Sequence, residues 1–442
     1  MPLIFNNIFS IAVAVGDTLM AAAIGPLQLA AVAIGAGVWI ALFLLGLGVV
    51  MALGPTVAQH TGGRRFLEIG QDTQQGLWLA LAVSMVVVVA MRNAEDALHL
   101  IGVDPAVAIL AQGYLDALSF GVPCAYAYHV LKQMNEGIGR TLPIMLVMAV
   151  ALPLNILLNF GFMFGHFYAE PLGAIGSGLG SGIAFCLMYI ALALYVLRAG
   201  RYRRYGLSAV FCWPQKPALA RLIRLGGPIG LSLFLQSGLF TTVALLIGRL
   251  GPVELAAHQI VLNYCGLVFM VPLGLGMALT VCVGQAVGRR DMQSAGRIGF
   301  IGIALCGAIA SGSCVATLLW GAEIASFYST DAEVALVASE LFLVAAILQF
   351  ADGVQVAAAF ALRGLKDTRV PLLLNAVCYW GIGFTFAYFA GVYWDFGASG
   401  IWLGLTLGLA AAAVSLTRRF AVVTQRLREL SSELHQVSTA AV

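Results

Sequence analysis

An internal repeat is the feature of this sequence that most constrains its fold. Residues 25–64 and 251–290 align at a constant shift of 226, with sixteen identities in forty positions. Chance agreement in so apolar a composition would be roughly a tenth of the positions, so the match indicates a duplication. A second alignment, shifted by 227, pairs Asp104 with Asp331 and Gly137 with Gly364. The chain is therefore a tandem duplication, and its two halves are expected to fold alike.

The composition places both halves in a lipid bilayer. Apolar residues make up 61% of the 442 residues and charged residues only 10%, a balance that water-soluble domains do not have. An apolar run of about 20 residues crosses roughly 30 Å of hydrocarbon as a helix, and the period-two alternation of a membrane barrel is absent. The net charge of +3 gives no sign of a nucleic-acid partner. We predict an all-α integral membrane protein.

Twelve such runs can be delimited, six in each half of the chain. The predicted spans cover residues 3–24, 30–58, 75–92, 106–131, 142–165, 172–197, 224–248, 256–286, 296–320, 334–361, 370–391 and 396–417.

The spans group into two six-helix bundles. Residues 1–205 form the predicted amino-terminal lobe and residues 206–421 the carboxy-terminal lobe, which begins with a cytoplasmic linker at 206–222; a polar tail follows at 422–442. Each repeat has an even number of spans, so both lobes share one orientation. This predicts a pseudo-twofold axis along the membrane normal and a V shape around a central cavity.

Lysine and arginine indicate the orientation in the membrane. Loops after even-numbered spans, together with the tail, hold 21 of the 23 basic residues, and the opposite loops hold only Arg92 and Arg249. By the positive-inside rule both termini are cytoplasmic. The basic run at 201–204 is in the first place such a topology signal, and its alternative role is a site for a lipid headgroup.

Acidic residues within the spans are the first candidates for function, because an ionisable side chain in hydrocarbon costs at least a few kcal/mol. Asp17 and Asp352 lie clearly inside spans, and Asp116 and Glu340 are further candidates. No lysine or arginine lies within a span to neutralise Asp17 or Asp352. An unpaired buried carboxylate either takes up a proton or binds a cation, and both are ion-coupling chemistry. The alternative is an acid that stays protonated and bonds a neighbouring carbonyl.

Polar side chains in the fifth and sixth spans could complete an ion site. Asn155 and Asn159 lie at i, i+4 on one helix face, where their amide oxygens are hard ligands for Na⁺ or a hydrated proton. The alternative role for both is ordinary interhelical hydrogen bonding. The glycine-rich stretch at 173–184 permits close helix approach, and Ser177 or Ser181 could add a hydroxyl.

Four segments together resemble the multidrug and toxic compound extrusion (MATE) family, in its NorM-like branch. They read GDTLMAAAIGP, PLNILLNFGF, GPVELAAHQIVLN and ADGVQVAAAFALRGLKDT. The resemblance covers nearly the whole chain. It implies a multi-pass protein of the bacterial inner membrane that exports small organic cations in exchange for H⁺ or Na⁺ by alternating access, as a monomer among membrane lipids and without a cofactor.

The resemblance also implies roles for particular residues. Asp17, Asn155, Asn159 and Ser181 match the cation-coupling site of the amino-terminal lobe. Asp352 matches a site in the carboxy-terminal lobe, and Gln259 and Asp331 match positions near the substrate.

The sequence departs from the family pattern in the seventh span. NorM-like members usually have a glutamate there, where this chain has Gln236 in FLQSGLF. Glutamine takes no proton, although its carbonyl can coordinate a cation, so we expect Asp17 to be the principal switch. The chain also begins close to the first span, and we expect the native start to lie upstream.

Two other functions were weighed against export of organic cations. A flippase for lipid-linked precursors or polysaccharides would need basic residues in mid-membrane to meet phosphates, whereas the interior charges here are acidic. A membrane-embedded enzyme would need a nucleophile–base pair or a metal cluster, and the sequence shows neither pattern.

Overall fold

The computed structural model describes residues 2–100, 102–167, 170–207 and 211–440. These residues form helices joined by turns and short irregular connections, without a strand among them. They form two compact units, residues 1–230 and 231–442. The prediction of an all-α membrane protein built as two helical bundles is confirmed.

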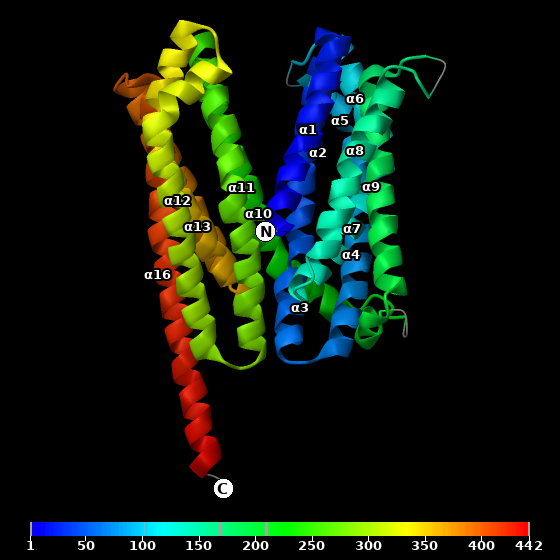
Figure 1. Cartoon of the computed structure of the whole chain (residues 1–442), viewed down its shortest axis with the longest axis vertical. Coiled ribbons are helices and arrows are strands. Elements are labelled where there is room, and N and C mark those ends of the chain that lie inside the picture. The colour runs from blue at the N-terminus through cyan, green and yellow to red at the C-terminus, as the bar shows by residue number, and fades with distance from the viewer. Residues whose placement is uncertain (1, 101, 168–169, 208–210, 441–442) are drawn as a thin grey trace. The chain divides into compact units, whose positions relative to one another are not determined.

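The amino-terminal unit holds the first repeat (Figure 1). Its helices are α1 (Pro2–Ile24), α2 (Pro26–Met51), α3 (Leu53–Gly62), α4 (Phe66–Arg92), α5 (Ala94–Leu100), α6 (Pro105–Ser119), α7 (Val122–Gly137), α8 (Leu142–Met163) and α9 (Gly173–Arg198), with a 3₁₀-helix η1 (Gly200–Tyr205) and the first part of α10 (Lys216–Gly248).

The carboxy-terminal unit holds the second repeat. It contains the rest of α10, then α11 (Pro252–Gly288), α12 (Met292–Tyr328), α13 (Ala332–Gly364), α14 (Arg369–Ala376), the π-helical turns η2 (Val377–Phe384) and η3 (Phe389–Tyr393) on either side of α15 (Thr385–Tyr388), and α16 (Gly397–Ala440).

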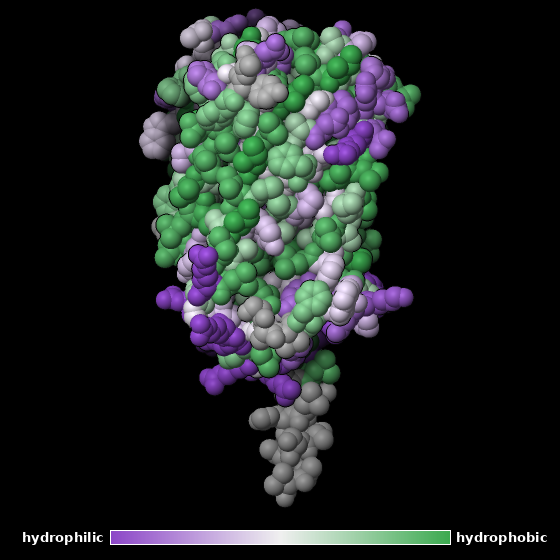
Figure 2. All heavy atoms as spheres, turned by 90° about the vertical axis from the view of Figure 1, so that its right-hand side faces the viewer, coloured by the Kyte–Doolittle hydropathy of each residue, from purple (hydrophilic) through white to green (hydrophobic). Residues whose placement is uncertain are grey.

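Most of the predicted spans correspond to helices that can cross a bilayer. Within the described ranges, ten segments are long and apolar enough by themselves, and the bent pair α6–α7 gives an eleventh. Helix α1 occupies the place of the first predicted span, although its apolar stretch is the shorter Val15–Ile24. A wide hydrophobic band lies between hydrophilic ends on the face of the molecule shown in Figure 2.

The duplication is visible in the local geometry of the two repeats. Gly25 and Gly251 have φ of 153° and 159°, and each precedes a helix with proline at its start. At the other end of the aligned segment Arg64 and Arg290 have φ of 55° and 62°, a left-handed conformation that is uncommon for residues other than glycine. The two repeats therefore have the same backbone conformation at both ends of the aligned segments.

Proline accounts for one difference between the repeats. The fourth predicted span, 106–131, is broken into α6 and α7, which meet at an angle of 52°. Pro123 lies in the first turn of α7, where a continuous helix would require the amide hydrogen that proline lacks. The equivalent position in α13, at a shift of 227, is Phe350, and α13 runs unbroken.

The segment predicted as a linker, 206–222, is largely part of the amino-terminal unit, which extends beyond the predicted boundary at 205 to Gly230. Helix α10 begins at Lys216, and Leu222 packs against Ala52 and Leu79. Because apolar residues in its first turns pack against the amino-terminal unit, helix α10 begins eight residues before the predicted span at 224. The tail beyond 421 is helical as well, as a continuation of α16.

Candidate functional site

The candidate site begins at Asp17, on the apolar half of α1. The neighbouring Gly16 places the backbone of α1 close to α8, because a methyl group at that position would lie 3.6 Å from Cγ1 of Ile156. At this contact the Asp17 carboxylate accepts a hydrogen bond from Nδ2 of Asn159, at 2.5 Å. The predicted pairing of the first and fifth spans is therefore present in the amino-terminal unit.

The two asparagines of α8 form a short chain of hydrogen bonds. Asn159 Nδ2 also donates to Oδ1 of Asn155 at 3.2 Å, as the i, i+4 spacing predicts. Asn155 Nδ2 in turn donates to Oγ of Ser181 on α9 at 3.2 Å. All three side chains of α8 and α9 are buried, with at most 6% of their surface exposed. The structure thus brings Asp17, Asn155, Asn159 and Ser181 together from three helices, and we call them the Asp17 cluster.

A glycine on α9 makes room for the cluster. A Cβ at Gly180 would collide with Oδ1 of Asn159 and lie 3.1 Å from its backbone nitrogen. Glycine is therefore required here so that α9 can approach the amide of Asn159. Ser177, the other predicted hydroxyl, is fully buried one turn before Ser181, and its Oγ has no hydrogen-bond partner among the described residues.

The electrostatics of the cluster are those of an acid without a counter-ion. Among the described residues no ion pair involves Asp17. Its surroundings are amide and hydroxyl groups, and the ring of Tyr114 on α6 lies near enough to interact electrostatically with it. In addition, Oδ1 of Asn159 is buried and has no partner within the described part of the chain. An unpaired carboxylate and an open acceptor oxygen can together hold a proton or a small cation.

The acid of the second unit is more isolated. Asp352 lies on α13 near Tyr379 and Cys265, and its Oδ1 is buried without a hydrogen-bond partner in the described residues. Gln236, half-buried on α10, makes no hydrogen bond to it in the structure as described. Asp17 and Asp352 thus both lie on spanning helices without an ion-pair partner in the part of the chain that the structure describes, but a chain of amide and hydroxyl groups meets only Asp17.

The two residues expected near substrate lie at the exposed start of helices. Asp331 is the N-cap of α13, and its carboxylate accepts hydrogen bonds from the backbone nitrogens of Glu333 and Val334 at 2.9 and 3.5 Å. Asp104 caps α6 in the same way at the equivalent position of the first repeat. Helix capping accounts for Asp331, while Gln259 is exposed near the start of α11.

The structure also contains a buried ionic pair that the sequence analysis missed. On α7, Nζ of Lys132 lies 3.9 Å from Oε1 of Glu136, and both residues are buried. The predicted span ended at 131, so both residues were assigned to a loop. The i, i+4 spacing of opposite charges was the signal that could have found them. Asp116 and Glu340, by contrast, are exposed, and Asp116 accepts a hydrogen bond from Gln112 at 2.9 Å.

Comparison with known proteins places the chain in a family. The MatE family profile matches residues 2–161 and 228–389. The multidrug resistance protein MdtK of Yersinia pseudotuberculosis serotype O:1b (strain IP 31758) is 36% identical over 425 residues, which cover 95% of this chain and 93% of that protein. MdtK of Proteus mirabilis (strain HI4320) is likewise 36% identical over 426 residues, with the same coverage.

Solved structures show the same fold. A crystal structure of a MATE transporter in its bent conformation has a TM-score of 0.89 at 19% identity, covering 98% of this chain and 95% of that one. The crystal structure of the eukaryotic MATE transporter AtDTX14 has a TM-score of 0.86 at 19% identity, covering 97% and 96%. The family profile and the MdtK relatives, which match along most of the chain, identify a secondary transporter and not an enzyme. The chain belongs to the MATE family of multidrug efflux transporters.

Proposed function

We propose that this transporter exports organic cations from the cytoplasm in exchange for H⁺ or Na⁺, and that the Asp17 cluster binds the coupling ion. The observation that carries the proposal is the Asp17 carboxylate, which is held by Asn159 and has no basic partner among the described residues. In a low-dielectric surrounding such a group gains most from binding a proton or a cation.

Charge change at Asp17 would act on the contact between α1 and α8. The ionised carboxylate accepts a charge-assisted hydrogen bond from Asn159, and such a bond is stronger than one between neutral groups. Protonation or cation binding weakens that bond and frees α1 to change its packing on α8. Because an ion drives a transition only through a difference in its affinity for two states, the two states must differ at this contact.

The hydrogen-bond pattern supports a proton more directly than a sodium ion. Asn159 presents Nδ2 to the carboxylate, whereas its Oδ1 is directed toward Gly180. A sodium ion between these groups requires oxygen ligands, so the amide would have to turn before it could coordinate. A proton requires no such rotation, because the carboxyl oxygen itself carries it.

We propose the orientation of the protein in the membrane from the distribution of its basic residues, as in the sequence analysis. The basic residues gather at the ends where α3 and α4, α9 and α10, and α11 and α12 are connected, and we place these ends and both termini in the cytoplasm. The coupling ion would then reach Asp17 from the outside, at the opposite ends of α1 and α8.

Efflux from proteoliposomes tests the function and distinguishes the ions. Purified protein is reconstituted, ethidium is loaded, and a pH gradient or a sodium gradient is imposed separately. We expect the pH gradient to drive ethidium movement several-fold faster than no gradient. Movement driven by sodium alone would assign Na⁺ as the coupling ion, and ethidium movement independent of both gradients would contradict an antiporter.

A further inference from the structure

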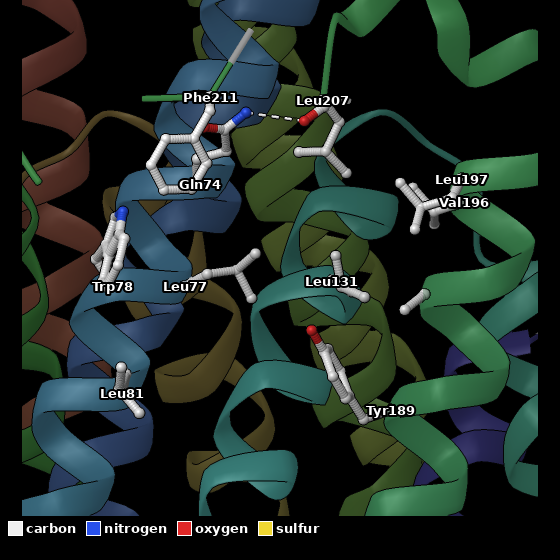
Figure 3. A pocket seen from close by; sticks show the side chains of 11 residues that line it. Gln74, Leu77, Trp78, Leu81, Leu131, Tyr189, Val196, Leu197, Leu207 and Phe211 are labelled. Atoms are coloured by element: carbon white, nitrogen blue, oxygen red, sulfur yellow. Dashed lines mark hydrogen bonds between the residues drawn. The ribbon is translucent and has the colours of Figure 1, made fainter. Parts of the chain in front are cut away.

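A groove on the amino-terminal unit has no role in the proposed transport cycle. It lies between α4 and α9 over α7, with a cavity volume of about 410 Å³. A smaller cavity of about 220 Å³ continues it toward Pro123 and Cys124 of α7 and shares Leu77, Leu81 and Tyr189 with it. We call the two together the α4–α9 groove. In Figure 3 Leu77 and Leu81 of α4 lie across from Val196 and Leu197 of α9, with Leu131 and Tyr189 between them.

The lining of the groove suits hydrocarbon. Among the described residues no charged side chain lines either cavity. The lining polar groups are Gln74 and the Trp78 indole nitrogen, which donates to the carbonyl of Cys212, the Tyr189 hydroxyl and the Cys124 thiol. The amide of Gln74 is already engaged, because Nε2 donates to the carbonyl of Leu207 at 2.8 Å and Oε1 accepts from the nitrogen of Cys212 at 2.6 Å. An organic cation would find no carboxylate here, whereas an apolar chain displaces nothing polar.

The groove opens toward the bilayer and extends through most of one leaflet. Leu81, Leu197 and Phe211 on its rim are 46%, 53% and 67% exposed. From Tyr189 to Leu197 α9 rises about 12 Å, at 1.5 Å per residue, compared with about 15 Å for half of the hydrocarbon thickness. The length of an acyl chain in one leaflet therefore matches the length of the groove.

Aromatic and basic residues lie at the end of the groove that corresponds to the membrane surface. Trp78 stacks on Trp213 with ring centroids 6.4 Å apart, and Phe211 packs edge-on against Trp213, an arrangement typical of side chains at the headgroup level. Arg198 directly follows the lining residue Leu197, and Arg201 and Arg203 lie on η1 between Leu197 and Leu207. All three arginines are exposed.

From this combination we infer that the α4–α9 groove binds one acyl chain of an anionic phospholipid whose phosphate is bound by Arg198, Arg201 and Arg203. The aliphatic lining selects the chain, and the guanidinium groups select a headgroup with net negative charge. The bound lipid would hold η1 and the segment at 211–215 against α4, and so belongs to the transporter as a structural partner.

Native mass spectrometry of the full-length protein tests the headgroup. The detergent-purified protein is titrated with dioleoyl phosphatidylglycerol and, separately, with dioleoyl phosphatidylcholine. We expect phosphatidylglycerol to be retained several-fold more strongly, and R198Q/R201Q/R203Q to lower its retention to that of phosphatidylcholine. The matched variant R289Q/R290Q/R426Q, which removes three exposed arginines elsewhere, should keep the preference. Equal retention of both lipids by the wild type, or equal loss in both triple variants, would overturn the proposal.

Filling the groove tests the acyl chain. Leu77→Trp should reduce retention of both lipids several-fold, whereas Val86→Trp, on an exposed part of α4 outside the groove, should not. Ala193→Leu is a smaller filling change that serves if Leu77→Trp does not fold. Unchanged lipid retention in the folded filled variant, or displacement of bound phosphatidylglycerol by ethidium, would refute lipid as the occupant.

Discussion

The amide of Asn159 links most of the Asp17 cluster. Its nitrogen donates to both Asp17 and Asn155, while its buried oxygen has no partner in the described residues. A buried polar atom without a partner costs about 1–3 kcal/mol. The cluster therefore keeps an unsatisfied acceptor beside an unpaired acid, which is the arrangement expected of a site that binds and releases an ion.

Gly180 gives a test of this arrangement at the residue scale. In Gly180→Ala the added methyl group collides with Oδ1 of Asn159, and overpacking of this kind costs about 1–3 kcal/mol. We expect a lower melting temperature and a several-fold slower ethidium efflux.

Gly37→Ala is the matched control for that substitution, because a methyl group at Gly37 meets no atom within 4 Å. It should leave stability and efflux unchanged or raise stability slightly, since alanine favours a helix over glycine. If Gly180→Ala behaved like Gly37→Ala, the close approach of α9 to Asn159 would have no functional importance.

Asp331 allows capping to be separated from substrate binding. Replacing an N-cap aspartate by alanine costs about 1 kcal/mol, whereas asparagine is an equally good cap. We expect Asp331→Ala to lower the melting temperature about as much as Asp104→Ala does at the equivalent cap, and Asp331→Asn to keep both stability and efflux. A folded, stable Asp331→Asn protein that fails to export ethidium would show that the carboxylate contacts substrate.

At the scale of the elements, residues between η1 and α10 are bound to α4 by two side-chain amides and an indole. Gln74 binds Leu207 and Cys212, Gln75 donates to the carbonyl of Trp213 and accepts from the nitrogen of Gln215, and Trp78 donates to the carbonyl of Cys212. These bonds give the backbone of an otherwise irregular segment the partners that it needs. They also explain why this segment packs as part of the amino-terminal unit.

Removing the amides should release the segment. In a protein with both Gln74→Ala and Gln75→Ala, we expect protease cleavage at 206–215 to be at least several-fold faster than in the wild type, with α4 still folded. Gln71→Ala, an exposed glutamine one turn earlier on α4, is the control. Unchanged cleavage in the double variant would mean that the aromatic contacts alone hold the segment.

The sequence predicted where the helices lie better than where they bend or begin. Span positions follow from apolar length, and the duplicated turns follow from the repeat, because both depend on local residues. The bend at Pro123 also has a local cause and could have been placed. The helical start of α10 could not, since it depends on packing of Leu222 against Ala52 and Leu79, which are distant in sequence.

At the scale of the whole molecule, the sequence predicted the residues of the candidate site, and the structure showed which of them lie together. The spacing of Asn155 and Asn159 predicted one helix face, and the resemblance supplied Ser181. Neither could show that Asn159 is the residue that reaches Asp17, or that Gly180 makes the space for it. The Lys132–Glu136 pair was missed because the predicted span stopped at 131, before both residues, whereas α7 continues to Gly137.

Two unpaired acids in a duplicated protein raise the question of which one drives transport. Asp17 accepts a hydrogen bond from Asn159 on α8, and Asn159 is linked through Asn155 to Ser181 on α9. Asp352, by contrast, has no hydrogen-bond partner on Oδ1 within the described chain. A charge change at Asp17 therefore alters interhelical bonds, while one at Asp352 has none at that oxygen to alter. We assign the coupling ion to the amino-terminal unit for this reason.

The most direct test is ethidium efflux by Asp17→Asn under the ion gradient that drives the wild type. Asparagine keeps the size of the side chain but cannot take up a proton or carry charge, so we expect folded protein with gradient-driven efflux reduced at least tenfold. Asp116→Asn, an exposed acid of the same unit, should retain wild-type efflux. Wild-type efflux in Asp17→Asn, or equal loss in both variants, would contradict the assignment of the coupling ion to Asp17.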